Sequence, residues 1–274
     1  MIGAICGDVC GSIYEFHNKK TKNITLFDEK CRFTDDSIMT IAIFKALQEC
    51  KGNYENLAQK AIENMREFGQ KYLHVGYGER FKNWIMCENP QPYNSWGNGS
   101  AMRISPVAYF CKSLEEVKKL SKMVTETTHN HPEGLKGAEA VAVCIWLAIN
   151  GESKETIKNY IEKNYYSLNF AYEDLRKNYT FKVSCQNSVP QAIYCFLLSK
   201  DFEDCLRTSI SIGGDSDTIS AISCSIAEAY YGLPKQFEEK TQNFLDDDLK
   251  PIAKEMISLR NKTMEKLKWQ KKQS

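Results

Sequence analysis

Apolar residues recur at helical spacing through most of this chain. Residues 36–50 place Ile38 and Ile41 on one face, and the pattern repeats over residues 54–70. Segments in which apolar and polar residues alternate between hairpin turns are almost absent. The pattern therefore predicts an all-α fold. Further helices are expected over residues 114–126, 135–150, 153–164, 188–199 and 202–211, over a run with Ile219, Ile222, Ile226 and Tyr230 that stops at Gly232 and Pro234, and over 235–271 as one or two helices.

The length and charge of the chain limit its architecture and its partners. Of its 274 residues 42% are hydrophobic, which is enough to bury one substantial core. No linker, repeat or low-complexity segment divides the sequence, so we expect a single domain over residues 1–274. The 36 basic residues nearly balance the 35 acidic ones, which argues against nucleic acid and anionic membranes as partners. A monomer is the starting assumption.

The eleven cysteines are scattered and lie mostly in apolar helical patterns. They are interpreted as buried thiols in a reducing compartment rather than as disulfides. Cys6 and Cys10 are four residues apart, but no second pair follows that would complete a zinc site. The amino-terminal segment has no basic leader, and no apolar stretch reaches transmembrane length. We expect a cytoplasmic protein.

The segment "SIGGDSDTISAI" carries unusual negative charge directly before an apolar helical run. Asp215 and Asp217 follow Gly213 and Gly214, a pair that lets the backbone turn tightly and approach a ligand. Aspartate and threonine are ordinary helix N-caps, but one such side chain is enough for capping. Metal binding is therefore favoured over capping alone, and capping remains the alternative.

A second acidic helix start lies in "FTDDSIMT", at Thr34, Asp35 and Asp36. Adjacent carboxylates raise each other's pKa unless a cation lies between them. The available donors are hydroxyl and carboxylate oxygens, which suit Mg²⁺ or Mn²⁺. If the fold brings the two starts together, a shared aspartate could bridge two ions. If it does not, the two starts are independent N-caps.

Three further candidates lie in predicted loops. Gly97 and Gly99 flank Asn98, and the backbone N–H groups of such a turn suit an anion such as phosphate, although an ordinary loop fits equally well. His129, in "TTHNHPEG", is either a polar contact or part of a turn. Glu15 follows the "GDVCGS" turn, where an isolated glutamate is usually a surface charge.

In their order along the chain, five motifs resemble the ADP-ribosylglycohydrolase family. They are "GAICGDVCGSIYEF", "FTDDSIMT", "GNGSAMRISP", "THNHPEGLKGAEAV" and "SIGGDSDTISAI". The family includes dinitrogenase-reductase-activating glycohydrolases and eukaryotic ADP-ribosyl-acceptor hydrolases. The resemblance implies a compact all-α domain with two Mg²⁺ or Mn²⁺ ions at the base of a cleft.

The resemblance also implies a role for individual residues. Glu15 matches a glutamate beside the metals and the scissile ribose, where it acts on water or gates entry. The expected catalytic residues are Glu15, Asp35 and Asp217. The expected metal ligands are Thr34, Asp35 and Asp36 for one ion, Asp215 and Thr218 for the other, and Asp217 for both. The expected ADP-ribose contacts are Asn94, Ser95, Trp96, Gly97, Asn98, Gly99, His129 and Val183.

The implied activity is metal-dependent hydrolysis of the C1″ glycosidic bond that links ADP-ribose to an acceptor. ADP-ribosylated protein is the expected partner, and arginine, serine, a nucleic-acid base and a small conjugate all remain open as acceptors. One alternative is an inactive family member that binds ADP-ribose. Another is a phosphohydrolase with a nucleophilic aspartate after a strand, but Ile219 stands where that motif has Thr or Val, and α/β alternation is missing.

Overall fold

The computed structural model describes residues 1–271, with side chains described to residue 266. Within residues 1–271 the regular structure is entirely helical, with fifteen α-helices and a single isolated β-bridge, so the all-α prediction is confirmed. The last three residues of the predicted domain, 272–274, lie outside the described residues. No helix within residues 1–271 combines the length and the apolar character needed to cross a membrane.

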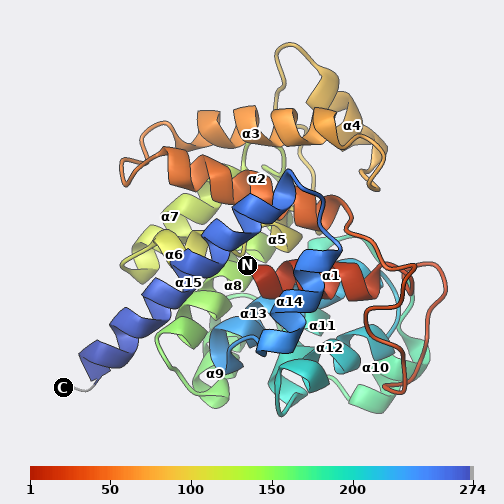
Figure 1. The fold of residues 1–274 in the computed structure, drawn as a ribbon. Coiled ribbons are helices and arrows are strands. Elements are labelled where there is room, and N and C mark those ends of the chain that lie inside the picture. The colour runs from red at the N-terminus through yellow and green to blue at the C-terminus, as the bar shows by residue number, and fades with distance from the viewer. Residues whose placement is uncertain (272–274) are drawn as a thin grey trace.

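Two helices distant in sequence form the centre of the molecule. They are α1 (Ile2–Gly11) and α13 (Ser216–Tyr231), which pack along each other (Figure 1). Every residue of α1 is buried, so this helix has no polar face and its sequence shows no clear helical period. It is therefore a helix that the sequence analysis did not predict.

Three glycines on one face of α1 allow this contact. A Cβ on Gly3 would stand 2.4 Å from the carbonyl oxygen of Cys224, and one on Gly7 would stand 2.2 Å from that of Ser220. A Cβ on Gly11 would stand 2.5 Å from Cα of Asp217. The backbone of α1 thus touches the backbone of α13, and the contact extends to the acidic start of α13.

Other helices surround this pair. Those packed around α13 and its neighbours are α5 (Gly99–Met102), α6 (Val107–Phe110), α7 (Leu114–Thr125), α8 (Pro132–Ile149), α9 (Lys154–Asn164), α11 (Cys185–Leu198) and α12 (Phe202–Ser211). At one edge, α2 (Asp35–Glu49) and α3 (Leu57–Lys71) lie side by side, next to α4 (Glu79–Met86). The remaining helices are α10 (Tyr172–Asn178), α14 (Lys235–Asn243) and α15 (Leu249–Lys271).

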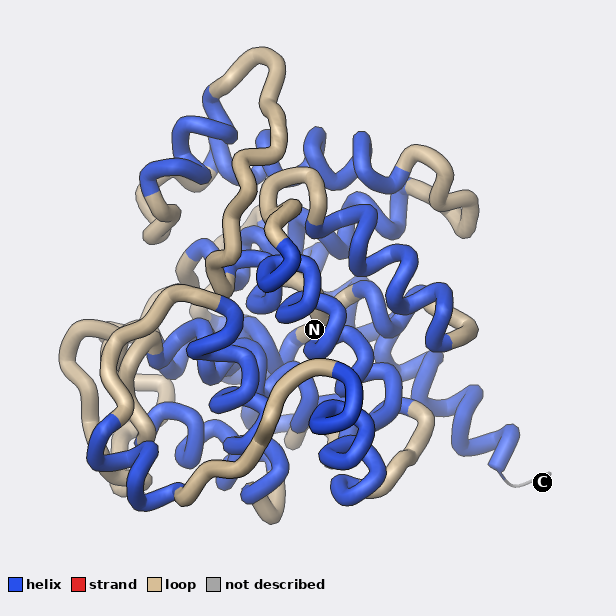
Figure 2. Tube along the Cα trace, turned by 180° about the vertical axis from the view of Figure 1, so that it is seen from behind, coloured by secondary structure: helices blue, strands red, loops and turns tan. Residues whose placement is uncertain are grey.

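The periodic segments of the sequence form helices close to the expected positions, and 235–271 forms two helices, α14 and α15. The short helices α4, α5, α6 and α10 were not predicted. Long loops over residues 12–34, 87–98 and 165–171 connect the helices and gather largely toward one side of the molecule (Figure 2). The expected irregular segment 87–106 is a loop only to residue 98, because α5 begins at Gly99.

Candidate functional site

A cavity of about 640 Å³ lies where the acidic helix starts and the long loops meet. Its lining includes residues from all five motifs in the sequence, and at least one from each of α2, α4, α5 and α13. Carboxylates form one part of the wall, and the glycine loop around Gly97 with His129 forms another. Exposed apolar side chains, Phe16, Phe181 and Val183, lie at its mouth.

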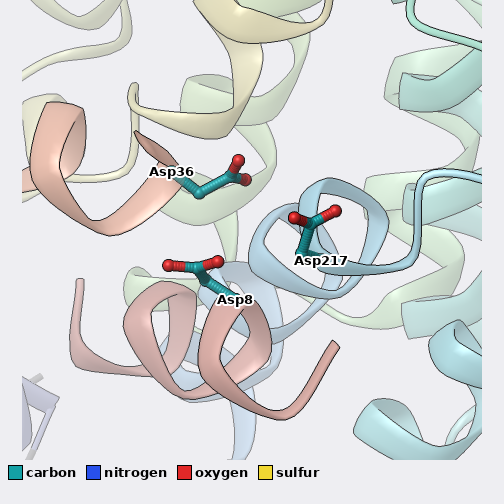
Figure 3. Close-up of side chains that lie close together, drawn as sticks. All are labelled: Asp8, Asp36 and Asp217. Carbon is teal, nitrogen blue, oxygen red and sulfur yellow. The ribbon is translucent and has the colours of Figure 1, made fainter. Parts of the chain in front are cut away.

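The two acidic helix starts come together in space. Carboxylate oxygens of Asp8, Asp36 and Asp217 lie within 4.8 Å of one another, and these side chains point toward a common space from α1, α2 and α13 (Figure 3). Oxygens of Glu15, Asp215 and Asp217 form a second group within the same limit. Asp217 belongs to both groups. The geometry is therefore that of two adjacent oxygen-rich sites with one side chain in common.

Asp8 is the cluster member that the sequence analysis missed. Its Oδ1 accepts a hydrogen bond from Thr34 Oγ1 at 2.6 Å. Its Oδ2 accepts from the backbone N–H groups of Thr34 and Ser37, at 2.8 and 3.1 Å, and from Ser37 Oγ. Asp8 therefore fixes the turn that starts α2. The one signal in the sequence is an aspartate in the middle of the apolar segment "GAICGDVCG".

The hydroxyl of Thr34 links Asp8 to the start of α2. Thr34 caps α2, because its Oγ1 accepts the N–H of Asp36 at 3.3 Å. Its hydroxyl donates its hydrogen to Asp8 Oδ1, so this hydrogen does not point toward the cavity. The neighbouring Asp35 is only partly buried, and it lines the cavity together with Thr34 and Asp36.

Asp36 carries a buried carboxylate oxygen that could hold a cation. Its Oδ2 accepts from Thr218 Oγ1 at 3.1 Å, whereas its Oδ1 is buried and has no hydrogen-bond partner among the described residues. A buried carboxylate oxygen without a partner is costly unless a cation or a proton satisfies it. The donors here are all carboxylate and hydroxyl oxygens, which fits Mg²⁺ or Mn²⁺.

The electrostatics of the cluster agree with this interpretation. Burial, reinforced by the charge of Asp217 and Asp8, raises the pKa of Asp36 well above its usual value. Burial, and then Asp215 and Asp8, does the same to the pKa of Asp217. Burial also raises the pKa of Asp215 to about 6. With protein groups alone, the carboxyls therefore favour the protonated form, and a divalent cation would compensate their charge.

Glu15 lies four residues beyond the end of α1 and directly before Phe16, which is exposed at the mouth of the cavity. Burial, followed by the charge of Asp217, raises the pKa of Glu15 to about 8. It is only partly buried and lines the cavity. A partly accessible carboxyl with a pKa near neutrality can give or take a proton from a bound molecule.

The backbone before Asp215 makes a tight turn. Gly213 and Gly214 have φ values of 68° and 77°, a conformation that side-chain-bearing residues rarely adopt. The loop after α1 holds this turn in place: Asn18 Oδ1 accepts from the N–H of Gly214 at 2.7 Å, and Lys20 Nζ donates to the carbonyl of Ile212 at 2.5 Å. The loop that carries Glu15 is thus connected to the loop that carries Asp215.

The glycine loop is attached to the start of α11 and to the cluster. Asn98 donates its backbone N–H to the carbonyl of Val183 at 2.8 Å and its side-chain amide to Asp215 Oδ2 at 2.7 Å. Ser95, Gly97, Asn98 and Gly99 line the cavity. The glycine loop thus forms a part of the cavity wall that adjoins the carboxylate cluster through Asn98.

Two residues of the predicted substrate loop lie apart from the cavity lining. The backbone N–H of Asn94 donates to Asn130 Oδ1 at 2.7 Å, and its φ of 53° turns the chain there. Trp96 is half-exposed and packs against His131, with ring centroids 5.3 Å apart. By contrast, the predicted contacts His129 and Val183 both line the cavity, one buried and the other exposed at its mouth.

The sequence analysis also missed several residues that line the cavity. They include Arg103, a buried cation, and the aromatic residues Phe16 and Phe181, whose rings stack at the mouth with centroids 5.9 Å apart. Arg103 and Phe16 each lie within a quoted motif, in "GNGSAMRISP" and "GAICGDVCGSIYEF", but nothing in their local pattern distinguishes them from core or surface residues.

Comparisons with known proteins agree with the geometry. A family model described as ADP-ribosylglycohydrolase matches residues 1–266. The chain is 26% identical to ADP-ribosylhydrolase ARH3 of Homo sapiens, over 91% of this chain and 90% of that protein. It is 23% identical to the ADP-ribosyl-(dinitrogen reductase) glycohydrolase of Rhodospirillum rubrum, over 85% and 84%. A solved ADP-ribosylglycohydrolase-related protein complex shares the fold, with a TM-score of 0.69 over 97% of this chain and 96% of that chain, at 19% identity.

Proposed function

The chain belongs to the ADP-ribosylglycohydrolase family, whose members hydrolyse glycosyl bonds, and we propose that it cleaves the C1″ bond between ADP-ribose and an acceptor in a metal-dependent reaction. The observation that carries the proposal is the pair of carboxylate groups sharing Asp217 at the cavity. The Oδ1 of Asp36 adds support, because it is a buried carboxylate oxygen that has no hydrogen-bond partner among the described residues.

The residues divide into those that would hold ions and those that would hold substrate. Thr34, Asp35 and Asp36 would bind one divalent ion, Asp215 and Thr218 the other, and Asp217 both. When bound, such ions supply positive charge that polarises substrate oxygens and stabilises negative charge as the bond breaks. The loop from Ser95 to Gly99, with His129, would hold the ADP-ribose diphosphate and distal ribose, and Val183 would contact the adenosine at the mouth.

Glu15 would move the proton. It lies beside Asp217 and directly before Phe16 at the mouth, where a water can approach the anomeric carbon from outside the cluster. An ionised Glu15 would accept a proton from the attacking water, and the protonated carboxyl would return it to solvent or to the departing acceptor. The products would be ADP-ribose and an unmodified acceptor.

The phosphohydrolase alternative finds no support in the fold. That mechanism places its nucleophilic aspartate directly after a strand, whereas the segment before Gly213 is the helix α12. The inactive-binder alternative predicts lost metal donors, and all six predicted metal positions carry an oxygen donor.

The test measures release of ADP-ribose from two test proteins, one modified on arginine and one on serine, with Mg²⁺, with Mn²⁺ and with EDTA. We expect metal-dependent release from at least one of them, and a loss of roughly 10³-fold or more in Asp217→Asn. Asp247→Asn, which changes a fully exposed carboxylate, is the matched control and should retain full activity. Equal release with EDTA would contradict the proposal.

A further inference from the structure

His129 presents its two ring nitrogens to different surroundings. Its side chain is only 4% exposed, and Nδ1 lies 2.7 Å from Thr128 Oγ1. Nε2 lies within 3.5 and 3.6 Å of the positions that a Cβ would occupy on Gly97 and Gly99. Within the described residues Nε2 has no hydrogen-bond partner. It is therefore the atom of His129 that can meet a ligand held by the glycine loop.

Thr128 lies between this histidine and a buried cation. Arg103 Nη2 donates to Thr128 Oγ1 at 2.7 Å, and a guanidinium can only donate. The hydroxyl of Thr128 keeps its own hydrogen, and His129 Nδ1 is the one acceptor recorded for that hydrogen in residues 1–266. The hydroxyl therefore donates to Nδ1, so Nδ1 carries no proton and the neutral ring carries its proton on Nε2.

Arg103 is held firmly enough to impose this direction. It is 1% exposed, has no ion-pair partner among the described carboxylates, and its guanidinium lies 5.8 Å from the centre of the Phe81 ring. Burial, and then the positive charges of Arg103 and Arg80, lower the pKa of His129 well below its usual value. A second proton on the ring is thus disfavoured, and Nδ1 stays an acceptor.

We propose that Arg103 and Thr128 are positioning residues that fix His129 as a neutral Nε2–H donor, aimed at a phosphate oxygen of the substrate bound over Gly97 and Gly99. The identity of that substrate rests on the proposed function, whereas the tautomer does not. A neutral imidazole that is held in the Nε2–H tautomer is preorganised to donate a hydrogen bond to an anionic oxygen.

The tautomer can be read directly by NMR of protein with ¹⁵N-labelled histidine rings. The chain has four histidines, and His129→Gln identifies the signals of His129. We expect the Nε2–H pattern in the unmodified protein and in Thr128→Ser, and a mixture that includes the Nδ1–H form in Thr128→Val. An Nδ1–H or doubly protonated ring in the unmodified protein would overturn the proposal, as would an unchanged pattern in Thr128→Val.

Binding of ADP-ribose provides the second readout. Thr128→Val should weaken binding roughly tenfold, and Thr128→Ser by less than about twofold. Thr125→Val is the matched control, because Thr125 is about as buried but its hydroxyl has no hydrogen-bond partner among the side chains described to residue 266, and it should change neither readout. If Thr128→Val does not fold, Thr128→Ala takes its place. An Nε2–H ring in a protein that does not bind ADP-ribose at all would refute the proposed function and leave the tautomer standing.

Discussion

The base of the cavity and its mouth are built differently. At the base, Asp36 and Asp217 stand at the starts of helices, and the α13 backbone is in direct contact with α1 through Gly7 and Gly11. At the mouth, Phe16 and Phe181 are 71% and 45% exposed and belong to loops. We therefore expect substitutions at the glycine contacts between α1 and α13 to displace the carboxylates, and substitutions of the exposed side chains at the mouth to leave them in place.

The strongest test of this contrast is an alanine in the glycine face of α1. In Gly7→Ala the new Cβ would stand 2.2 Å from a backbone carbonyl oxygen of α13, so the helices must separate. We expect a loss of about 3 kcal/mol or more in the free energy of unfolding, together with loss of activity, because the start of α13 would move. Denaturant unfolding measures the first effect.

Gly78→Ala is the control for that experiment. Gly78 lines the cavity, has a φ of −60° and has open space where a Cβ would stand. Its replacement should change stability by less than about 0.5 kcal/mol. Equal stability of the Gly7 and Gly78 variants would show that the contact between α1 and α13 accommodates an added Cβ as readily as the open position at Gly78 does.

A pH titration of stability tests the charge of the base. The pKa values of Asp8 and Asp215 are about 6 and that of Glu15 about 8, above the usual carboxyl range in unfolded chains. The folded protein therefore binds more protons than the unfolded chain between about pH 4 and pH 8, so its stability without metal falls as the pH rises. We expect Tm to drop by roughly 5 °C or more over this range with EDTA.

Saturating Mg²⁺ or Mn²⁺ should remove most of that drop, since the bound cation replaces the protons. Other titrating groups contribute equally with and without metal, so the difference between the two curves isolates the cluster. Two parallel curves would mean that the carboxyls do not bind the cation.

Asp8→Asn tests the support of the cluster separately from its ions. Both oxygens of Asp8 accept hydrogen bonds from the turn at Thr34 and Ser37, and the amide nitrogen of Asn cannot accept them. We expect the metal affinity, measured by calorimetry, to fall about 10- to 100-fold, while Asp247→Asn leaves it unchanged. Wild-type affinity in Asp8→Asn would show that the turn holds its position without this residue.

The smallest effect is expected at the mouth. Phe16→Ala removes one partner of an aromatic pair whose rings are largely exposed. We therefore expect stability within about 0.5 kcal/mol of the wild-type protein, and a few-fold higher KM for a modified protein with kcat nearly unchanged. A large fall in kcat would mean that the mouth takes part in the chemistry, and the contrast with the base would fail. Phe181→Ala should behave in the same way.

The sequence predicted the amphipathic helices well and the buried one not at all. Helices such as α7 and α9 have one polar and one apolar face, so their period is visible in the residues themselves. By contrast, α1 is buried on every side, so its sequence shows no polar face. The role of its glycines, which is to let the backbone of α13 approach, becomes visible only when α13 is packed beside them. The loops at the mouth carry exposed apolar residues whose purpose no local pattern indicates.

For the site, the sequence by itself determined the chemical type: oxygen donors at two helix starts, a turn that needs two glycines, and motifs that resemble one family. Only the tertiary structure decided which donors meet. Thr218 Oγ1 reaches Asp36 across 182 residues of chain, and Asp8 joins them from a third helix. Helical period and capping act within a few residues, whereas these distances follow from the packing of α1, α2 and α13, to which residues throughout the chain contribute.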